Sequence, residues 1–349
     1  MEEKTNIKPW QTEKSVKIDF SPNVAGKSIL LFAPFGATKH YGMAIREELQ
    51  RRGADVFLFD ERPSQNSITK IVIRLFKNSV PQLFDNYINK VIGDIGEKQI
   101  DFILICRGEA FTPLTIEHLR EAFPKAKVIL YLWDILAYCD KRNIIKCCDR
   151  AFSFDPEDVE NNDGLTFRPT FYVNQYSQMV HKAASYDICF IGTVYPPRQK
   201  AIRRLTASFY EQGLRFFRYM YVPGIIVYMR NLIKGFPFFH IWQVKFNPLN
   251  ISGITGILSE SLSIIDINPP VQKSLSTRPY EAMAARRKYI TTNKEIKEYD
   301  FYNENNIYVL DINHPVIPKS FFTKPFVDIP QDIMYKYSVR GLVDDLFND

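Results

Sequence analysis

The sequence SILLFAPFGATKHYG, residues Ser28–Gly42, decides the fold of the first half of the chain. Its apolar run Ser28–Phe35 has the composition of a buried parallel strand, and Pro-Phe-Gly ends the run. From Gly42 to Arg52 apolar residues recur with helical spacing, and Gly53 is a helix stop. A strand that leads through a turn into a helix is the repeating unit of a parallel α/β sheet.

The same unit recurs along the rest of the chain. In the N-terminal half the next expected strands are Ala54–Phe59, Asp101–Cys106, Val128–Trp133 and Ala151–Phe154. The expected helices between them cover about Ile68–Gly96, Pro113–Phe123 and Ala137–Cys148. The pattern restarts at Tyr186–Gly192, and later strands are expected near Leu214–Tyr219, Ser263–Ile267, Lys288–Thr291 and Asn306–Leu310. This alternation predicts an α/β fold with two open, mostly parallel sheets.

The length of the chain predicts two domains, because 349 residues exceed the size of an ordinary single domain. We expect an N-terminal domain over residues 1–175 and a C-terminal domain over 176–335. Residues 336–349 should form a C-terminal helix that packs back on the first domain. Two open sheets of this kind leave a cleft at the carboxyl ends of their strands, where such sheets bind ligands.

Composition excludes several classes of protein. A hydrophobic fraction of 46% and a charged fraction of 24% are those of a globular protein. The net charge of +6 favours anionic partners, but the basic residues are dispersed, so nucleic acid is not expected. The five cysteines form no CxxC pair, which indicates reduced thiols. A polar start and short apolar runs predict a cytoplasmic protein whose membrane contact, where it has one, is peripheral on the inner face.

Three titratable residues after the strands of the first half are candidate catalytic groups. His40 lies in the turn after the first strand and can accept a proton near neutral pH, although a loop histidine can equally bond to backbone. Glu109 follows the third strand and Asp134 follows the fourth, so both belong to the same sheet edge. Each could be a general base, bind sugar hydroxyls or cap a helix.

In the second half, the turn after Tyr186–Gly192 is a candidate diphosphate site. Gly192 and Thr193 lead into a basic helix that carries Arg198 near its start. Backbone N–H groups at a helix start and a guanidinium suit a diphosphate, although a surface charge is the commoner use of such a residue.

Ser276–Glu281 is the second donor-binding candidate. Ser276 and Thr277 supply hydroxyls before a helix, Arg278 suits a phosphate, and Glu281 suits the paired hydroxyls of a ribose. The alternative is an ion pair between Arg278 and Glu281 on the helix surface, which contributes less than about 1 kcal/mol.

At these residues the sequence resembles GT-B glycosyltransferases of bacterial lipopolysaccharide, capsule and exopolysaccharide biosynthesis, including the spore-maturation-type and group 1-like enzymes. The resemblance rests on Thr277–Ala282, Lys288–Asn293 and Tyr299–Ile307, with support from Trp133–Asp134, Phe152–Asp158, Arg168–Tyr172 and Tyr186–Gly192. It implies two Rossmann-like domains facing a cleft. It also implies transfer of a sugar from a nucleotide-sugar donor to a surface-glycan or lipid-linked acceptor.

The resemblance also implies roles for single residues. Glu281 would bind the donor ribose, and Arg198 and Arg278 would neutralise the diphosphate without a bound metal or other cofactor. Many retaining members carry two glutamates, but Lys273 stands at the earlier position here, so the stereochemistry stays open. Two alternatives remain: a non-catalytic protein that binds nucleotide sugars or glycans, and an epimerase or phosphorylase of the same fold.

Residues Gly213–Val244 mix aromatic and aliphatic side chains with arginine and lysine. Basic and aromatic residues together suit peripheral contact with an anionic membrane, where a lipid-linked acceptor would lie. Two core elements with basic edges are the alternative interpretation.

Overall fold

The structure, a computed structural model, describes residues 24–63, 80–234, 239–269 and 272–348. It divides into two compact units: unit 1 ends at Thr170 and also contains the chain from Lys336 onward, and unit 2 covers Phe171–Tyr335. The polar N-terminal leader, the first part of the helix expected over Ile68–Gly96 and residues 235–238 lie outside the described residues.

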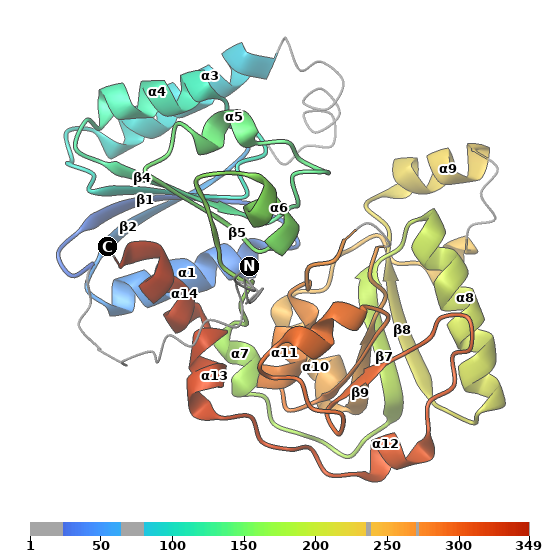
Figure 1. The fold of residues 1–349 in the computed structure, drawn as a ribbon. Helices are drawn as coiled ribbons and strands as arrows, with labels where there is room; N and C mark the ends of the chain where they lie inside the picture. The colour runs from blue at the N-terminus through green and yellow to red at the C-terminus, as the bar shows by residue number, and fades with distance from the viewer. Residues whose placement is uncertain (1–23, 64–79, 235–238, 270–271, 349) are drawn as a thin grey trace, which may run out of the picture. The chain divides into compact units, whose positions relative to one another are not determined.

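Unit 1 is built on a six-stranded parallel sheet with the strand order β2-β1-β3-β4-β5-β6. Its strands are β1 (Ser28–Ala33), β2 (Asp55–Asp60), β3 (Phe102–Cys106), β4 (Lys127–Leu132), β5 (Arg150–Ser153) and β6 (Leu165–Phe167). Its helices are α1 (Lys39–Arg51), α3 (Val80–Ile95), α4 (Pro113–Ala122), α5 (Arg142–Ile145), α6 (Pro156–Asn161) and α14 (Val339–Phe347). In Figure 1, α3 and α4 lie on one face of the sheet, and α1 and α14 lie on the other.

The sequence explains how these elements form and stop. The central strands carry almost only buried aliphatic side chains, as strands covered by helices on both faces require. Thr112 begins α4 by accepting a hydrogen bond from the Thr115 N–H, and Pro113 occupies the first helical position. Gly42 lets α1 pack closely on β1, because a Cβ there would lie 2.6 Å from that of Ala33.

The C-terminal helix α14 packs in unit 1 against α1. Arg52 of the α1 end pairs with Asp344 and donates to the Arg340 carbonyl oxygen at 2.9 Å. Arg150 donates to the Leu346 carbonyl oxygen at 3.0 Å. The last helix is therefore held by two arginines, one at the end of α1 and one in β5.

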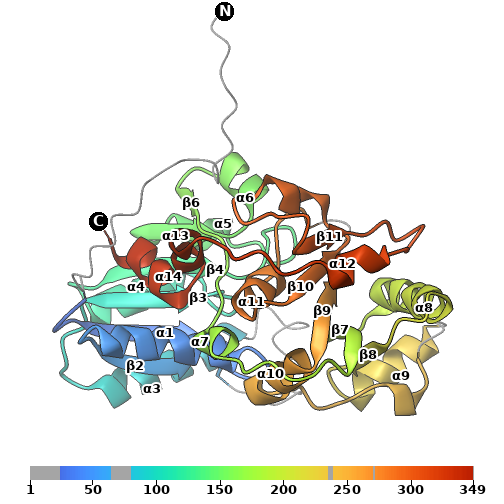
Figure 2. The same cartoon turned by 90° about the horizontal axis from the view of Figure 1, so that it is seen from below.

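Unit 2 is built on a five-stranded parallel sheet with the strand order β11-β10-β9-β7-β8. Its strands are β7 (Tyr186–Thr193), β8 (Phe216–Tyr221), β9 (Ser261–Asp266), β10 (Lys288–Thr291) and β11 (Ile307–Val309). Its helices are α7 (Asn174–Ser177), α8 (Pro196–Glu211), α9 (Ile225–Ile233), η2 (Ile241–Gln243), α10 (Ile251–Ser259), α11 (Arg278–Ala284), η3 (Lys294–Glu298) and α12 (Lys319–Thr323); α13 (Gln331–Lys336) leads back to unit 1. Figure 2 shows α8 and α9 together at one end of this unit.

One expected helix is much shorter in the structure than the sequence predicts. The helix expected over Ala137–Cys148 is only the short α5, because other bonds hold the segment before it. Asp140 accepts a hydrogen bond from the Arg142 N–H at 3.1 Å, a local turn that competes with helix formation. The Lys141 ammonium donates to the Glu109 carbonyl oxygen at 2.8 Å, which holds this segment against the turn after β3.

Candidate functional site

In unit 1, charged side chains gather where the parallel strands end. We call them the carboxylate–arginine cluster: Glu61, Arg62, Arg107, Glu109 and Asp134. They follow β2, β3 and β4, three strands that lie in one sheet with only β1 between β2 and β3. The carboxyl edge of a parallel sheet is the usual place for ligand-binding side chains.

Arg107 lies at the centre of this cluster. Its Nε donates to Asp134 Oδ2 at 2.7 Å, its Nη2 lies 2.7 Å from Glu109 Oε2, and its Nη1 lies 3.5 Å from Glu61 Oε1. Its φ of 71° is uncommon for a residue with a side chain and turns the chain sharply after β3. Burial disfavours its charge, but the three carboxylates outweigh burial and raise the pKa of Arg107.

Glu61 is the fully buried carboxyl group of the cluster. Its Oε2 accepts a hydrogen bond from the Glu109 N–H at 3.1 Å. Burial raises the pKa of the Glu61 carboxyl to about 7, although Arg107 and Arg62 act to lower it. A carboxyl with this pKa is partly protonated near neutral pH.

The structure thus brings Glu109 and Asp134, two of the three predicted catalytic residues, onto one guanidinium. His40 lies at the start of α1, with its ring 4.1 Å from the ring of Tyr41. The ring of Tyr41 in turn contacts the ring of Trp133 edge-on, with 6.1 Å between the ring centroids. Trp133 directly precedes Asp134 in the chain. His40 is therefore joined to this edge of the sheet through aromatic rings.

In unit 2 a second group of polar side chains lies at the ends of β7 and β9. We call it the unit 2 edge cluster: Arg198, Asp266, Ser276, Arg278 and Glu281. Four of its five residues were predicted as donor-binding residues, together with the adjacent Gly192, Thr193 and Thr277. β7 and β9 are neighbours in the sheet, so their ends place these residues together.

Arg198 joins the two strand ends. Its Nε and Nη2 donate to the Ile267 carbonyl oxygen at 3.2 and 2.8 Å, and its Nη1 donates to the Thr193 carbonyl oxygen at 3.2 Å. A Cβ at Gly192 would lie 3.1 Å from Cζ of Phe190, so the glycine makes room for this aromatic ring beside Arg198. The two residues before Arg198 are prolines, which have no N–H to offer a phosphate at the start of α8.

Arg278 and Glu281 form an ion pair, with Arg278 Nη1 donating to Glu281 Oε2 at 2.5 Å. The pair differs from the surface pair considered as the alternative, because Glu281 is only 2% exposed. Arg278 also donates from Nη2 to the Ile191 carbonyl oxygen at 3.2 Å, which ties α11 to the end of β7. The buried hydroxyl of Tyr176 has a pKa raised by burial and by the nearby Glu281 carboxylate.

Ser276 connects this pair to the end of β9. Its hydroxyl donates to Asp266 Oδ2 at 2.7 Å, and its Oγ accepts from the Arg278 N–H at 3.2 Å. The Tyr289 hydroxyl also donates to Asp266 Oδ2, at 3.4 Å. Guanidinium, hydroxyl and carboxylate groups therefore form one connected network, which is the chemistry that a phosphorylated, hydroxyl-rich ligand requires.

Sequence reasoning missed some members of both clusters. Glu61 and Arg62 follow β2 directly, and Asp266 ends β9. The rule that selected Glu109 and Asp134, a charged residue just after a strand, would have selected these residues too. No comparable signal marks Tyr176, because only the packing of α7 against α11 brings it to the Arg278–Glu281 pair.

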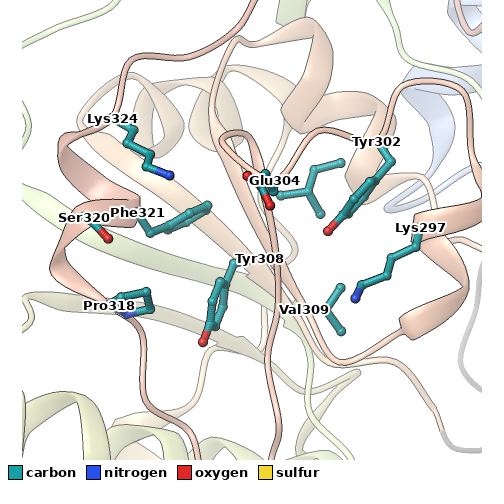
Figure 3. A pocket seen from close by; sticks show the side chains of 10 residues that line it. Lys297, Tyr302, Glu304, Tyr308, Val309, Pro318, Ser320, Phe321 and Lys324 are labelled. Atoms are coloured by element: carbon teal, nitrogen blue, oxygen red, sulfur yellow. The ribbon is translucent and has the colours of Figure 1, made fainter.

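A pocket of 310 Å³ lies elsewhere in unit 2, beside the edge strand β11 (Figure 3). Tyr302, Tyr308 and Phe321 line it together with Lys297 and Lys324. Glu304 also faces this hollow. None of the predicted site residues lines this pocket. In the described part of the chain, no group of three His, Cys, Asp or Glu residues is arranged to hold a metal ion.

Two Rossmann-like domains, each a parallel sheet covered by helices, make up the GT-B fold, and the chain has this fold. No protein-family model and no curated protein sequence matches the chain. Solved structures are similar over most of its length. One is HepE of Anabaena in complex with UDP and glucose, 11% identical, covering 92% of this chain and 95% of HepE with a TM-score of 0.51.

Two further structures are similar to the same extent. The catalytic domain of starch synthase IV from Arabidopsis thaliana, bound to ADP and acarbose, is 10% identical and has a TM-score of 0.53, with 92% of this chain and 98% of that chain covered. A glycosyltransferase from Rickettsia africae is 12% identical and has a TM-score of 0.50, with 92% and 94% covered. At this identity the likeness establishes the fold, and the predicted GT-B architecture of two Rossmann-like domains is confirmed.

Proposed function

We propose that the protein is a glycosyltransferase that moves a sugar from a nucleotide-sugar donor to the hydroxyl of a surface-glycan or lipid-linked acceptor. The observation that carries the proposal is the unit 2 edge cluster, where two arginines, a serine and two carboxylates form one network at the ends of β7 and β9. The fold supports it, because the solved structures of similar fold include glycosyltransferases and complexes with UDP and ADP.

The residues of the unit 2 edge cluster divide the work of donor binding. Arg198 and Arg278 neutralise the diphosphate, as cationic side chains do where no metal takes that role. Ser276 and Thr277 offer hydroxyls to the phosphate oxygens, and the backbone of Gly192 and Thr193 lies beside Arg198.

We further propose that donor binding exchanges partners within the Arg278–Glu281 pair. Glu281 holds Arg278 at 2.5 Å in the structure, and an arriving phosphate would compete with its carboxylate for the guanidinium. A carboxylate released in this way can accept the two hydroxyls of a ribose. The ion pair is then the resting state of the binding site.

On the acceptor side, a base must take the proton of the attacking hydroxyl. His40, Glu109 and Asp134 are the predicted candidates, and the buried Glu61 carboxyl lies beside them, where it accepts a hydrogen bond from the Glu109 N–H. The leaving diphosphate is stabilised by the arginines of the unit 2 edge cluster, so no cofactor is needed beyond the substrate itself.

The acceptor and the location follow from the sequence resemblance. We propose an acceptor from lipopolysaccharide, capsule or exopolysaccharide synthesis, either a surface glycan or a lipid-linked sugar. An enzyme that uses such an acceptor would be cytoplasmic and would work at the inner face of the membrane. The basic, aromatic residues 213–244 support this contact. Across the described residues, no helix has both the length and the apolar character needed to cross a bilayer.

Thermal unfolding with a panel of UDP, GDP, ADP, CMP and dTDP tests the donor site. A nucleotide that binds only the folded chain raises the unfolding temperature by mass action. We expect one of the nucleotides to raise the unfolding temperature more than the others. This rise should disappear in Arg198→Ala but remain in the control Lys200→Ala, which changes an exposed residue of the same helix. No stabilisation by any of the five nucleotides would contradict the proposal.

Product analysis separates the alternatives. A binding protein without activity would be stabilised by the nucleotide but would leave the nucleotide sugar intact. An epimerase would convert the nucleotide sugar without an acceptor, and a phosphorylase would cleave a glycan only with phosphate. The proposed transferase consumes the donor and yields a glycosylated acceptor.

A further inference from the structure

The helix α9 exposes an apolar stripe to solvent. Its exposed apolar side chains are Ile225, Ile226, Met229, Leu232 and Ile233. Positions 225, 229, 232 and 233 follow the i, i+4, i+7, i+8 spacing of a helix face that normally packs on a core. Ile233 is 82% exposed and Ile226 is 65% exposed, so this stripe is a packing face without a covering element in the described part of the chain.

The opposite side of α9 is firmly attached to unit 2. The Tyr228 side chain is buried, and its hydroxyl donates to the Phe239 carbonyl oxygen at 3.0 Å. Its ring contacts Phe246 edge-on at 6.0 Å, and Asn231 is buried beside it. These contacts fix the rotation of the helix and turn the apolar stripe away from the core. Figure 1 shows α9 at the periphery of unit 2, beside α8.

The charges around the stripe have one sign. No Asp or Glu occurs in the chain between Glu211 and Glu260. At about 100° per residue, Arg230 lies about 40° from Ile226 at the border of the stripe, and Lys234 lies at the C-terminal end of α9. Both are exposed, and neither has an acidic partner among the residues that the structure describes.

An exposed tryptophan follows in the segment tied to α9. Trp242 of η2 is 71% exposed, and His240 stacks on its ring at 4.4 Å. Ile241 beside it is also exposed. Tryptophan is enriched where protein meets the boundary between lipid headgroups and acyl chains. This chain segment and α9 therefore share one chemistry, which is apolar, aromatic and cationic.

We propose that α9 and η2 form a docking surface for an anionic lipid bilayer, with the stripe lying at the headgroup boundary and Arg230 and Lys234 contacting lipid phosphates. Apolar area combined with flanking cations is what holds an interfacial helix at such a membrane. A second copy of the chain fits less well, because two-fold pairing of this face would bring its cations together. The contact deepens the proposed function, since it locates a lipid-linked acceptor, but the binding itself needs neither nucleotide nor sugar.

Flotation of the full chain with vesicles tests the proposal. We expect binding to mixed vesicles of phosphatidylcholine and phosphatidylglycerol, and much weaker binding to phosphatidylcholine alone. Ile226→Asp combined with Ile233→Asp should reduce binding at least about tenfold, because two large apolar side chains are lost from the contact. Arg230→Gln with Lys234→Gln should also weaken binding and reduce its sensitivity to salt.

A matched control uses apolar residues that are equally exposed elsewhere. Val180 is 79% exposed and Leu114 is 71% exposed, so Val180→Asp with Leu114→Asp should leave vesicle binding unchanged. Equal binding by the α9 variant and the control would overturn the proposal. So would a wild-type dimer that the α9 variant converts to monomer without any vesicle binding. Nucleotide stabilisation measured on the same samples reports separately on the proposed function, because α9 carries none of the donor-binding residues.

Discussion

Glu61 gives the carboxylate–arginine cluster a specific dependence on pH. Its carboxyl titrates near pH 7 in the folded chain and near 4.5 in the unfolded chain, so the folded chain binds more protons between these values. The free energy of unfolding therefore falls as the pH rises from about 4.5 to about 7. Glu61→Gln keeps an oxygen that can accept the Glu109 N–H but does not titrate. It should remove the decrease in the free energy of unfolding that Glu61 causes, and stabilise the chain above pH 7 by at most about 3 kcal/mol.

Urea unfolding at a series of pH values measures this effect. Glu117→Gln, a change of an exposed carboxyl on α4, is the matched control and should follow the wild-type profile. If Glu61→Gln follows the wild-type profile as well, burial does not raise the pKa of the Glu61 carboxyl and the group is not protonated near neutral pH.

The Arg278–Glu281 pair should show strong coupling. Arg278→Gln alone leaves the buried Glu281 carboxylate without its cation, which costs about 3 kcal/mol of stability. Arg278→Gln combined with Glu281→Gln removes both charges and should cost less than the single change. A double-mutant cycle from denaturant unfolding gives the coupling, and additive effects of the two changes would show that the pair is not formed in solution.

At the scale of elements, α14 should be essential to unit 1. Leu342 is fully buried in this helix, which packs on α1. Leu342→Ala should lower the free energy of unfolding by about 2–5 kcal/mol, because the cavity is not refilled. Leu114→Ala removes an exposed leucine and serves as the control. If urea unfolding shows the same loss of free energy for both changes, Leu342 is not packed as described.

The strands were the predictable elements. Each expected strand has its counterpart in one of the two parallel sheets, and Lys288–Thr291 has the expected bounds. A short aliphatic run is buried wherever it lies, so composition alone identifies it. The helix expected over Ala137–Cys148 forms only as α5, because Asp140 accepts the Arg142 N–H in a local turn and Lys141 is held against the turn after β3.

The carboxylate–arginine cluster and the unit 2 edge cluster could be predicted only in part from the sequence. Residues directly after strands can be assigned to a sheet edge from the sequence, which is how Glu109 and Asp134 were found, whereas Arg278 was found at the start of a helix. Whether two such residues touch depends on strand order, and β2 neighbours β1 and not β3 in the sheet. The contact of Glu61 with Arg107, and that of Tyr176 with Glu281, are therefore properties of the tertiary fold.

At the scale of the whole molecule, each of the two parallel sheets carries a group of functional side chains at its carboxyl edge. The carboxylate–arginine cluster in unit 1 offers proton-exchanging groups, and the unit 2 edge cluster offers cations and hydroxyls. A transferase needs both kinds of chemistry, one for the acceptor hydroxyl and one for the leaving diphosphate. The proposed function assigns one to each unit.

The most direct test of this account uses the nucleotide sugar that corresponds to the stabilising nucleotide. The quantity measured is the rate at which the protein releases nucleoside diphosphate from it. We expect release to accelerate with an acceptor glycan and to fall by at least about a hundredfold in Arg198→Ala, because a cation on the leaving group is lost. Lys200→Ala should retain the wild-type rate. Full release by Arg198→Ala, or no release by the wild type with any of the nucleotide sugars, would contradict the account.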